Sequence, residues 1–524
     1  MSSRKRPSDG RMSRALQARH RERSARMNPQ DQRRAWLQDE RGALVKEAPH
    51  RLALCYPNPY RVAMSSLGYQ VVYRTMNDRP WLSAERVVLP DDVELYRDKG
   101  WVPCGIETGR PLNQYDTLAF SIAYDLDISG FFDLLSMSGV TMLSADRRDE
   151  EPAVLLGGPL TASNPLPLGP FIDLAVIGDA EVALPLVLDA MEVATGRRDL
   201  MERCASIPGV WIPALHGDAV PATQKVTVGS LPAYGQIMTP HTELSNMFLI
   251  EASRGCPRFC KFCLVRASES PMREPELEAV MARIPDDAPR VGFVGAAVSE
   301  WTGIRSALDR VVKSGRGVGV SSLRADRLDQ EFVDLLARGG YRTMTVASDA
   351  PSQRLRNKLA KGIRTRHLRD AAQFAREAGM NRLKMYLVMG LPDEREDDID
   401  ELIEFARELS SLMPLALGIC PLVPKLHTPL GDAPFVGVRE ADAVLKRIRR
   451  ELKGAVDVRS VSARWAWVEY RLSQGDQETG LAALDAWRQG GRFAHWKAAL
   501  SELPERGGLD AALRFGLFQA VGMR

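Results

Sequence analysis

The sequence predicts an α/β protein in which a doubly wound domain is followed by a second block of βα units and then by a helical C-terminal region. First, short β-rich runs alternate with amphipathic helical stretches, which is typical of parallel strands joined by right-handed crossovers. Second, several runs within residues 50–200 end in loops of glycine, proline and polar residues, as in domains that bind a ligand at the carboxyl edge of their sheet. Third, residues 437–524 have a helical pattern, with amphipathic pieces at 443–452 and 483–487.

Five β-rich runs are expected to form the strands of the doubly wound domain, which we place at residues 46–200. The runs are 52–56, 86–89, 116–122, 153–156 and 172–177. The fourth run ends in a Gly-Gly-Pro sequence and the fifth in a Gly-Asp-Ala-Glu sequence, and both endings suit the ligand edge of a sheet. Residues 201–244 are expected to be a linker.

The second block, residues 245–436, begins with a strand at 248–252 that runs into a cysteine-rich loop. Further β-rich runs follow at 291–295, 317–326, 341–349 and 383–389, and amphipathic helical runs lie between or after them at 303–314, 327–338, 366–378 and 396–409. This alternation predicts parallel βα units, and the loops after the strands are expected to build a site.

Length and composition are those of a folded, multidomain protein. The chain has 524 residues, enough for about three or four domains of roughly 150 residues. Apolar residues make up 45% and charged residues 26%, which excludes disordered and collagen-like chains. The sequence has no run of about 18 apolar residues that predicts a membrane span, and no apolar stretch follows the basic N-terminus as in a secretory signal. We therefore expect a cytoplasmic protein with no membrane contact.

The net charge of +3 is unevenly distributed. Residues 1–34 hold eleven Lys and Arg against three acids, a net of +8, which leaves −5 for the rest of the chain. This segment is rich in Arg and Ser and has no apolar periodicity, so we expect residues 1–45 to be a disordered basic arm. Such an arm is able to contact nucleic acid through its charge, and a solubilising tail is the simpler interpretation.

Seven cysteines in a chain of this length do not form a disulfide framework, which indicates a reducing compartment. Four are isolated and are expected to be small buried residues: Cys55, Cys104, Cys204 and Cys420. The other three, Cys256, Cys260 and Cys263, lie within eight residues. This spacing is far closer than composition alone predicts, so the loop is the strongest candidate for a chemical site.

Closely spaced thiols serve zinc sites, redox pairs and iron–sulfur clusters. Structural zinc usually closes four ligands, and no second Cys-x-x-Cys or paired His lies near this loop. A redox pair uses two cysteines, typically in a thioredoxin-like context. Three thiolates on one loop suit a cubane cluster with one iron left open, and an open metal position is where chemistry takes place. We therefore favour a three-thiolate cluster over zinc or a structural role.

The strand, the loop and the Cys-x-x-x-Cys-x-x-Cys spacing together resemble the radical S-adenosylmethionine (SAM) superfamily. The resemblance implies a partial (β/α)6 barrel and a [4Fe–4S] cluster whose metal ligands, and the catalytic residues, are Cys256, Cys260 and Cys263. It further implies that SAM binds the open iron. Phe262 occupies the family's aromatic position before the third cysteine and is expected to pack near the SAM adenine.

The later strands also resemble those of this superfamily, which implies SAM contacts from residues near their carboxyl ends. The expected SAM-binding residues are Gly295, Ser299, Glu300, Ser322, Arg324, Asp326, Asp349, Gly390 and Leu391. After the fourth strand, relatives have Pro-Glu-Ala-Gly-Ser, whereas residues 348–352 of this chain have a shorter acid and no glycine. Arg354 follows at a helix start and is a candidate for the SAM carboxylate, or else a solvated helix arginine.

A doubly wound domain before such a barrel resembles the cobalamin-binding radical SAM enzymes, and this likeness covers residues 50–500. It implies a Rossmann-like cobalamin-binding domain whose contacts are Tyr56, Asn58, Ser65, Ser66, Tyr124, Gly157, Gly158, Pro159, Gly178 and Glu181. The Asp-x-His-x-x-Gly motif that supplies a lower histidine ligand to cobalt is absent. The family often binds cobalamin without it, and an unligated lower face favours methyl transfer in the family's chemistry. The alternative is a domain that has the fold without the cofactor.

Two features near the C-terminus allow more than one interpretation. The run 464–470 is aromatic and basic, which suits an RNA or peptide surface, or else a helix that buries Trp465 and Trp467 against the barrel. Lys425 and His427 follow the last expected barrel strand and are candidates for facing the substrate, and a structural loop explains them equally well.

The resemblance implies a radical SAM enzyme that reductively cleaves SAM and acts as a cobalamin-dependent C-methyltransferase on an unactivated carbon. An electron donor such as a ferredoxin or flavodoxin is the expected partner. The substrate, whether RNA, peptide or small molecule, is not readable from the sequence. The alternatives are a rearrangement or cyclisation enzyme without methyl transfer, and a non-catalytic cobalamin or cluster sensor.

Overall fold

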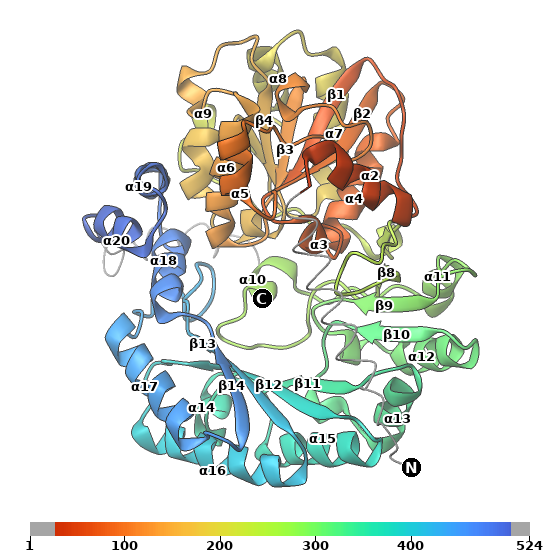
Figure 1. The fold of residues 1–524 in the computed structure, drawn as a ribbon, viewed down its shortest axis with the longest axis vertical. Helices are drawn as coiled ribbons and strands as arrows, with labels where there is room; N and C mark the ends of the chain where they lie inside the picture. Colours follow the sequence, from red (N-terminus) through yellow and green to blue (C-terminus); the bar gives the residue numbers. More distant parts are fainter. Residues whose placement is uncertain (1–26, 505–524) are drawn as a thin grey trace, which may run out of the picture.

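The computed structural model describes residues 27–504, and within them the chain forms three β-sheets (Figure 1). The N-terminal sheet has the order β2-β1-β3-β4-β5-β6. Its strands are β1 (His50–Tyr56), β2 (Leu82–Val88), β3 (Thr117–Ser121), β4 (Ala153–Gly157), β5 (Leu174–Val176) and β6 (Val210–Trp211). The first five are parallel and β6 is antiparallel to β5. The five expected strands are therefore present, with bounds that differ by a few residues.

Helices cover both faces of this sheet, so the N-terminal domain is doubly wound. They are α2 (Pro29–Asp39), α3 (Tyr60–Ala63), α4 (Leu67–Asn77), α5 (Val93–Lys99), α6 (Ile128–Ser138), α7 (Ala180–Val193), α8 (Arg197–Cys204) and α9 (Pro213–His216). One apolar core joins a sheet face to α4 and α7 through residues such as Tyr73 and Val187. The core on the other face contains Phe131 and Phe132 of α6.

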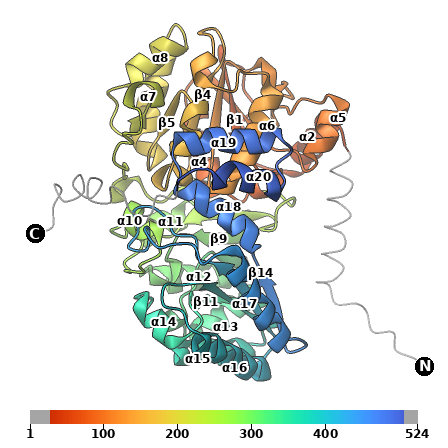
Figure 2. The same ribbon diagram turned by 90° about the vertical axis from the view of Figure 1, so that its left-hand side faces the viewer.

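The last helices of the chain return to the N-terminal domain. They are α18 (Ala463–Ser473), α19 (Gln477–Arg488) and α20 (Phe493–Ser501). Leu472, Leu484 and Trp496 from these three helices share one core with Phe131 of α6. Figure 2 shows α19 and α20 lying against this domain rather than against the barrel.

The second block forms two further sheets, in the orders β10-β9-β8-β7 and β11-β12-β13-β14. Their strands are β7 (Tyr234–Gly235), β8 (Met247–Glu251), β9 (Arg290–Val294), β10 (Gly317–Val320), β11 (Thr343–Ala347), β12 (Arg382–Met389), β13 (Leu415–Pro421) and β14 (Val456–Ser460). The accompanying helices are α10 (Leu264–Glu269), α11 (Leu277–Ala282), α12 (Ile304–Lys313), α13 (Gln330–Arg338), α14 (Gln353–Lys358), α15 (Thr365–Glu377), α16 (Glu396–Leu412) and α17 (Val438–Glu451). No helix within residues 27–504 is both long enough and apolar enough to cross a bilayer.

These two sheets together form one curved layer of strands. A single apolar core contains Phe293 of β9, Met344 of β11 and Leu417 of β13. Where the ladder is interrupted between β10 and β11, the Tyr341 hydroxyl donates to the Val320 carbonyl oxygen (3.0 Å) and accepts from the Val320 N–H (2.5 Å). Six parallel strands, β8 to β13, therefore follow one another with helices between them, which agrees with a barrel-like α/β fold.

Three expectations about the segments around these blocks are corrected by the structure. The region after residue 437 is not wholly helical, because β14 extends the second sheet in parallel to β13. The expected linker at 201–244 contributes β6 to the N-terminal sheet and β7 to the barrel. Within the expected disordered arm, residues 29–39 form α2, while residues 1–26 lie outside the described part.

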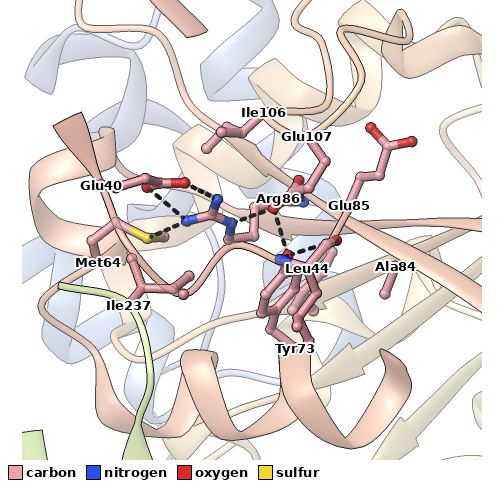
Figure 3. Close-up of polar contacts among 12 residues, drawn as sticks. Glu40, Leu44, Met64, Tyr73, Ala84, Glu85, Arg86, Ile106, Glu107 and Ile237 are labelled. Atoms are coloured by element: carbon pink, nitrogen blue, oxygen red, sulfur yellow. Dashed lines mark hydrogen bonds and ion pairs between the residues drawn. The ribbon is translucent and has the colours of Figure 1, made fainter. Parts of the chain in front are cut away.

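A buried ion network explains why α2 is part of the fold (Figure 3). Glu40, which follows α2, pairs with the fully buried Arg86 of β2. On its other side Arg86 binds Glu107 (2.6 Å), and the hydroxyls of Tyr60 and Tyr73 donate to Glu40 and Glu107 (2.5 and 2.8 Å). Because a buried charge is tolerated only when it is paired and hydrogen-bonded, these contacts fix α2 against the sheet.

Candidate active site

The carboxyl ends of the N-terminal sheet and of the barrel strands face each other across one junction (Figure 1). Lys425 follows β13, and its ammonium lies 2.5 Å from the carboxylate of Asp125, which follows β3. Arg254 follows β8 and lies 2.9 Å from Glu181 in the first turn of α7. Ligand-binding loops of both kinds of fold lie at these strand ends, so both expected cofactor sites border the same junction.

The three motif cysteines lie on the loop between β8 and α10. Cys260 is buried, Cys256 and Cys263 are half-buried, and Cys263 directly precedes the first turn of α10. Burial raises the pKa of the Cys260 and Cys263 thiols, while Lys361 opposes this rise at Cys260. The backbone N–H groups of the first turn of α10 oppose it at Cys263. The three thiols lie within eight residues of this one loop, and the charges of Cys263 and Cys256 raise the pKa of Cys260 and Cys263 respectively.

The donor set of this loop fits an iron–sulfur cluster. Among residues 27–504, no three His, Cys, Asp or Glu side chains lie close enough together to hold a single metal ion. The irons of a cubane are separate ligand positions, so cysteines that bind it need not converge on one point. Three thiols on one loop are soft ligands of the kind these clusters use, and three rather than four leave one iron open.

Most of the expected SAM-binding residues are brought together at the carboxyl ends of β9 and β10. The Ser322 hydroxyl donates to the Gly295 carbonyl oxygen (3.0 Å), and the Ser299 hydroxyl accepts from the Arg324 N–H (3.0 Å). The Arg324 guanidinium also binds Asp326 (3.0 Å). These residues, distant in sequence, therefore form one polar cluster.

Glu300 is the centre of this polar cluster and connects it to the cysteine loop. Its buried carboxylate lies 2.5 Å from Arg258, 3.1 Å from Arg324 and 2.9 Å from Arg327. Arg258 belongs to the cysteine loop itself, and only its position inside the motif could have marked it in the sequence. The structure thus commits the Glu300 carboxylate to three arginines, whose charge-assisted hydrogen bonds fix its orientation.

The residues after the fourth barrel strand have different surroundings. Asp349 has a left-handed backbone (φ 59°) and pairs with Lys361. Lys361 lowers the pKa of the Cys260 thiol and Asp349 raises it, although burial is the largest cause of its shift. Arg354 instead binds Asp398 (2.5 Å), and 41% of its side chain is exposed. The contacts of Arg354 favour a helix-surface arginine over a ligand for the SAM carboxylate. The pairing of Lys361 with Asp349, and its effect on the pKa of Cys260, place Lys361 beside the cysteine loop, although no sequence motif marked it.

The expected adenine-side residues form an apolar patch. Phe262 packs against a small cluster that contains Ala350 and Leu391. The turn after β12 needs glycine at position 390, where φ is 74°, and the Glu394 carboxylate accepts from the Gly390 N–H (2.9 Å). Phe262 from the cysteine loop and Leu391 from the last expected SAM turn therefore pack in one apolar cluster.

Four of the residues expected at the cobalamin edge lie at or just after the carboxyl ends of β1, β3 and β4. The carboxylate of Asp127 accepts hydrogen bonds from the Asn58 amide (2.8 Å) and from the Tyr124 N–H (3.1 Å). Burial raises the pKa of Tyr56, and the charge of Asp127 adds to this rise. Tyr124 is 39% exposed, and a Cβ added at Gly157 would meet nothing within 4 Å. No histidine of the described chain lies in the loops after β1, β3, β4 or β5, so these loops supply no lower imidazole to cobalt.

The other residues expected at this edge have structural contacts, and their cobalamin contacts stay predictions. They are Ser65, Ser66, Gly158, Pro159, Gly178 and Glu181. The two serines bind backbone groups of α3 and α4. A Cβ at Gly158 or Gly178 would lie 2.5 or 2.3 Å from a neighbouring carbonyl oxygen, so close packing requires both glycines. Pro159 begins a 3-10 turn, and Glu181 binds Arg254.

Lys425 is buried where the N-terminal domain, the barrel and α18 meet. Its ammonium lies 2.5 Å from Asp125 and 2.8 Å from Glu469, and the Tyr124 hydroxyl donates to Glu469 (2.5 Å). Burial lowers the pKa of Lys425, but the two carboxylates outweigh burial and raise it overall. This pairing favours the structural interpretation of Lys425. Glu469 was not marked by the sequence, because its partners lie far away along the chain.

The aromatic run of α18 is packed inside the protein. The ring centroids of Trp465 and Trp496 are 6.5 Å apart, and those of Trp467 and Phe493 are 6.2 Å apart. Both α18 tryptophans are half-buried against the core that α19 and α20 share with the N-terminal domain. The helix packs as expected, but its tryptophans lie against α20 and the core of the N-terminal domain rather than against the barrel. RNA or peptide as a substrate stays a prediction.

Two family models match this chain. The model described as radical SAM proteins, N-terminal, matches residues 68–213, and that of the radical SAM superfamily matches residues 250–406. Together they cover more than half of the chain, and the second spans the cysteine loop and the strands that carry the polar cluster. The chain belongs to the radical SAM superfamily.

This chain is also similar to individual proteins. The uncharacterised protein MJ0966 of Methanocaldococcus jannaschii is 26% identical over 72% of this chain and 78% of that protein. The uncharacterised methyltransferase PH0819 of Pyrococcus horikoshii is 22% identical over 50% of this chain and 59% of its own length. Among solved structures, the cobalamin-dependent SAM radical enzyme OxsB with aqua-cobalamin bound has a TM-score of 0.46 and 11% identity, over 90% of this chain and 75% of that one.

Proposed function

We propose that this radical SAM enzyme is a cobalamin-dependent C-methyltransferase that acts on an unactivated carbon of its substrate. The observation that carries the proposal is the junction at which the carboxyl edge of the doubly wound domain faces the cysteine loop. The ion pairs of Lys425 with Asp125 and of Arg254 with Glu181 define it from two sides. An enzyme that uses two large cofactors on one substrate requires such an arrangement, because the reacting groups must be held close together.

The bound groups would supply the chemistry, namely a carbon-centred radical from SAM cleaved at the cluster and a transferable methyl group from cobalamin. The protein's residues hold and orient them. Cys256, Cys260 and Cys263 are the cluster ligands, and the nearby Lys361 ammonium favours the thiolate of Cys260. At the adenine side, Phe262 supplies an apolar surface.

The polar cluster around Glu300 fixes the loops that surround SAM. Arg258 ties the cysteine loop to Glu300 (2.5 Å), and Arg324 ties the loop after β10 to the same carboxylate (3.1 Å). The serine bonds to Gly295 and Arg324 hold the backbone beside them. Groups locked in this way keep their orientation when a ligand binds, which is the preorganisation that catalysis needs.

Three observations support the cobalamin and methyl-transfer part of the proposal. Gly157 leaves open space at the carboxyl edge of the N-terminal sheet, and Tyr124 exposes its ring there. The loops after the parallel strands of that sheet hold no histidine, which agrees with a corrinoid that has no protein ligand beneath it. The relative that is similar over half of this chain has a name that describes it as a methyltransferase.

The proposal is tested on full-length protein reconstituted anaerobically with iron, sulfide and hydroxocobalamin, then incubated with SAM and a strong reductant. We expect 5′-deoxyadenosine above the level of a Cys260→Ala control, and corrinoid that stays with the protein through gel filtration. 5′-Deoxyadenosine without retained corrinoid would favour a rearrangement or cyclisation enzyme. Retained corrinoid without SAM cleavage would favour a sensor. The absence of both SAM cleavage and retained corrinoid would overturn the proposal altogether.

A further inference from the structure

The turn between β5 and α7 is bound to the cysteine loop by an ion network that the proposed chemistry does not use. Arg254 lies two residues before the first motif cysteine and binds Asp179 (3.0 Å) and Glu181 (2.9 Å) of that turn. It also binds Glu251 at the end of β8 (2.7 Å). A second arginine, Arg273, binds the other carboxylate oxygen of Asp179 (2.9 Å). Two arginines of the barrel block therefore hold one turn of the N-terminal domain.

The orientation of Asp179 shows that this contact is favoured over a local one. Asp179 occupies the N-cap position of α7, where an aspartate side chain usually accepts a hydrogen bond from its own helix. Here the side chain makes no such bond. Its carboxylate is turned toward Arg254 and Arg273, and it also accepts from the Val226 N–H (2.8 Å). The Asp179 side chain therefore contacts the barrel block instead of capping α7.

Arg273 belongs to a strap, residues 269–273, that holds the backbone around the first cysteine. The N–H groups of Arg254 and Arg273 donate to each other's carbonyl oxygens (3.0 and 2.8 Å). The hydroxyl of Ser270 donates to the carbonyl oxygen of Cys256 (3.1 Å). Gly255 has φ 82°, and a Cβ there would lie 2.3 Å from a strap carbonyl oxygen. The path of the chain into Cys256 is therefore set by a strap that Arg273 joins to Asp179.

The network has an excess of negative charge in a mostly buried place. Two guanidinium groups and the nearby Lys225 ammonium face four carboxylates, those of Asp179, Glu181, Glu251 and Glu269. Burial raises the pKa of Glu269, and the charge of Asp179 adds to the rise. Buried networks of this kind are sensitive to the loss of a single member, because the remaining charges lose their partners.

We infer that Asp179 and Glu181 are positioning residues for the cysteine loop, through which the N-terminal domain holds Cys256 in place for the cluster by way of Arg254 and Arg273. The inference rests on the proposed cluster site. It gives the Gly-Asp-Ala-Glu turn a role toward the cluster rather than only toward a corrin. The N-terminal domain is then part of the cluster site, not only a carrier of the second cofactor.

The test compares full-length wild type with Asp179→Asn and Glu181→Gln, all reconstituted anaerobically. The readouts are the rate of iron loss to a chelator and the electron paramagnetic resonance spectrum of the reduced cluster with and without SAM. We expect each variant to lose iron about tenfold faster, which corresponds to about 1.4 kcal/mol, and to show an altered spectrum. Arg254→Gln combined with Glu181→Gln should be no worse than Arg254→Gln alone, because the two residues act through one contact.

Asp189→Asn is the matched control. Asp189 lies on the same helix, α7, but its ion pair is with Arg79 of the N-terminal domain itself (2.9 Å). The Asp189→Asn variant should have the wild-type rate of iron loss and the wild-type electron paramagnetic resonance spectrum. If Asp179→Asn fails to fold, Glu181→Gln serves alone, because Glu181 is the more exposed of the two. Wild type that binds no cluster would refute the proposed function, whereas a stable wild-type cluster with unchanged variants would refute only the positioning role.

Discussion

Replacing Lys425 by methionine tests whether the three parts of the protein are held together at the junction. The change removes an ammonium but keeps most of the apolar stem, and it leaves Asp125 and Glu469 as buried carboxylates without their cation. Removing one partner of a buried ion pair typically costs about 3–5 kcal/mol. We expect about 3 kcal/mol, the lower end, because 19% of the Lys425 side chain remains exposed.

This loss is measured by urea denaturation, by calorimetry and by limited proteolysis. The control is Lys446→Met on the exposed side of α17. Proteolysis is included because a multidomain chain need not unfold in one step. Adding Asp125→Asn and Glu469→Gln to the methionine variant should restore much of the lost stability, since the uncompensated charges are then gone. A loss below about 1 kcal/mol, equal to that of the control, would refute the idea that this network holds the junction.

The stability difference between wild type and Lys425→Met should also depend on pH in a defined way. Burial lowers the pKa of Lys425, but Asp125 and Glu469 raise it above its ordinary value of 10.5. A cation with a raised pKa contributes its full stabilisation below its unfolded pKa and loses it as the pH rises through the folded value. The difference between wild type and Lys425→Met should therefore be constant from about pH 7 to about pH 9 and shrink only above about pH 10.5. A difference that disappears near neutral pH would contradict this assignment.

Three further changes test other parts of the structure. Arg86→Met should cost about 4 kcal/mol in urea unfolding, because Glu40 and Glu107 are then fully buried without a cation, and a cost under 1 kcal/mol would show that α2 is held otherwise. Glu300→Gln should weaken SAM binding to the reconstituted protein about tenfold, since three arginines lose their common carboxylate, and an unchanged Kd would remove Glu300 from the site. Burial raises the pKa of Cys420 to about 11, so iodoacetamide at pH 8 should label it much more slowly in native than in denatured protein, by mass spectrometry. Equal rates would place Cys420 in contact with solvent.

The sequence predicts those features that depend on local spacing. The cysteine loop follows a strand as expected, and the residues of the SAM strands meet because parallel strands end at one edge. The doubly wound domain was also predictable, since its five parallel strands lie within 127 residues, from His50 to Val176.

Contacts between distant segments were not predictable in this way. Glu469 joins Lys425 and Tyr124 only because the chain returns to the N-terminal domain after the barrel. Asp179 joins Arg254 because the loop after β8 lies against the turn before α7. A charged residue in a loop or on a helix gives the same local pattern whether it faces water or a buried partner. Helix α2 was missed for a related reason, since the Arg86 network that fixes it lies outside the arm.

Anaerobic isolation followed by iron, sulfide and spin-resonance analysis tests the central claim most directly. The account predicts about four irons and four sulfides per chain, a reduced cluster whose spectrum changes when SAM is added, and loss of all of these in a triple alanine variant of Cys256, Cys260 and Cys263. Protein that contains stoichiometric zinc, or that holds no iron and sulfide after reconstitution, would contradict it.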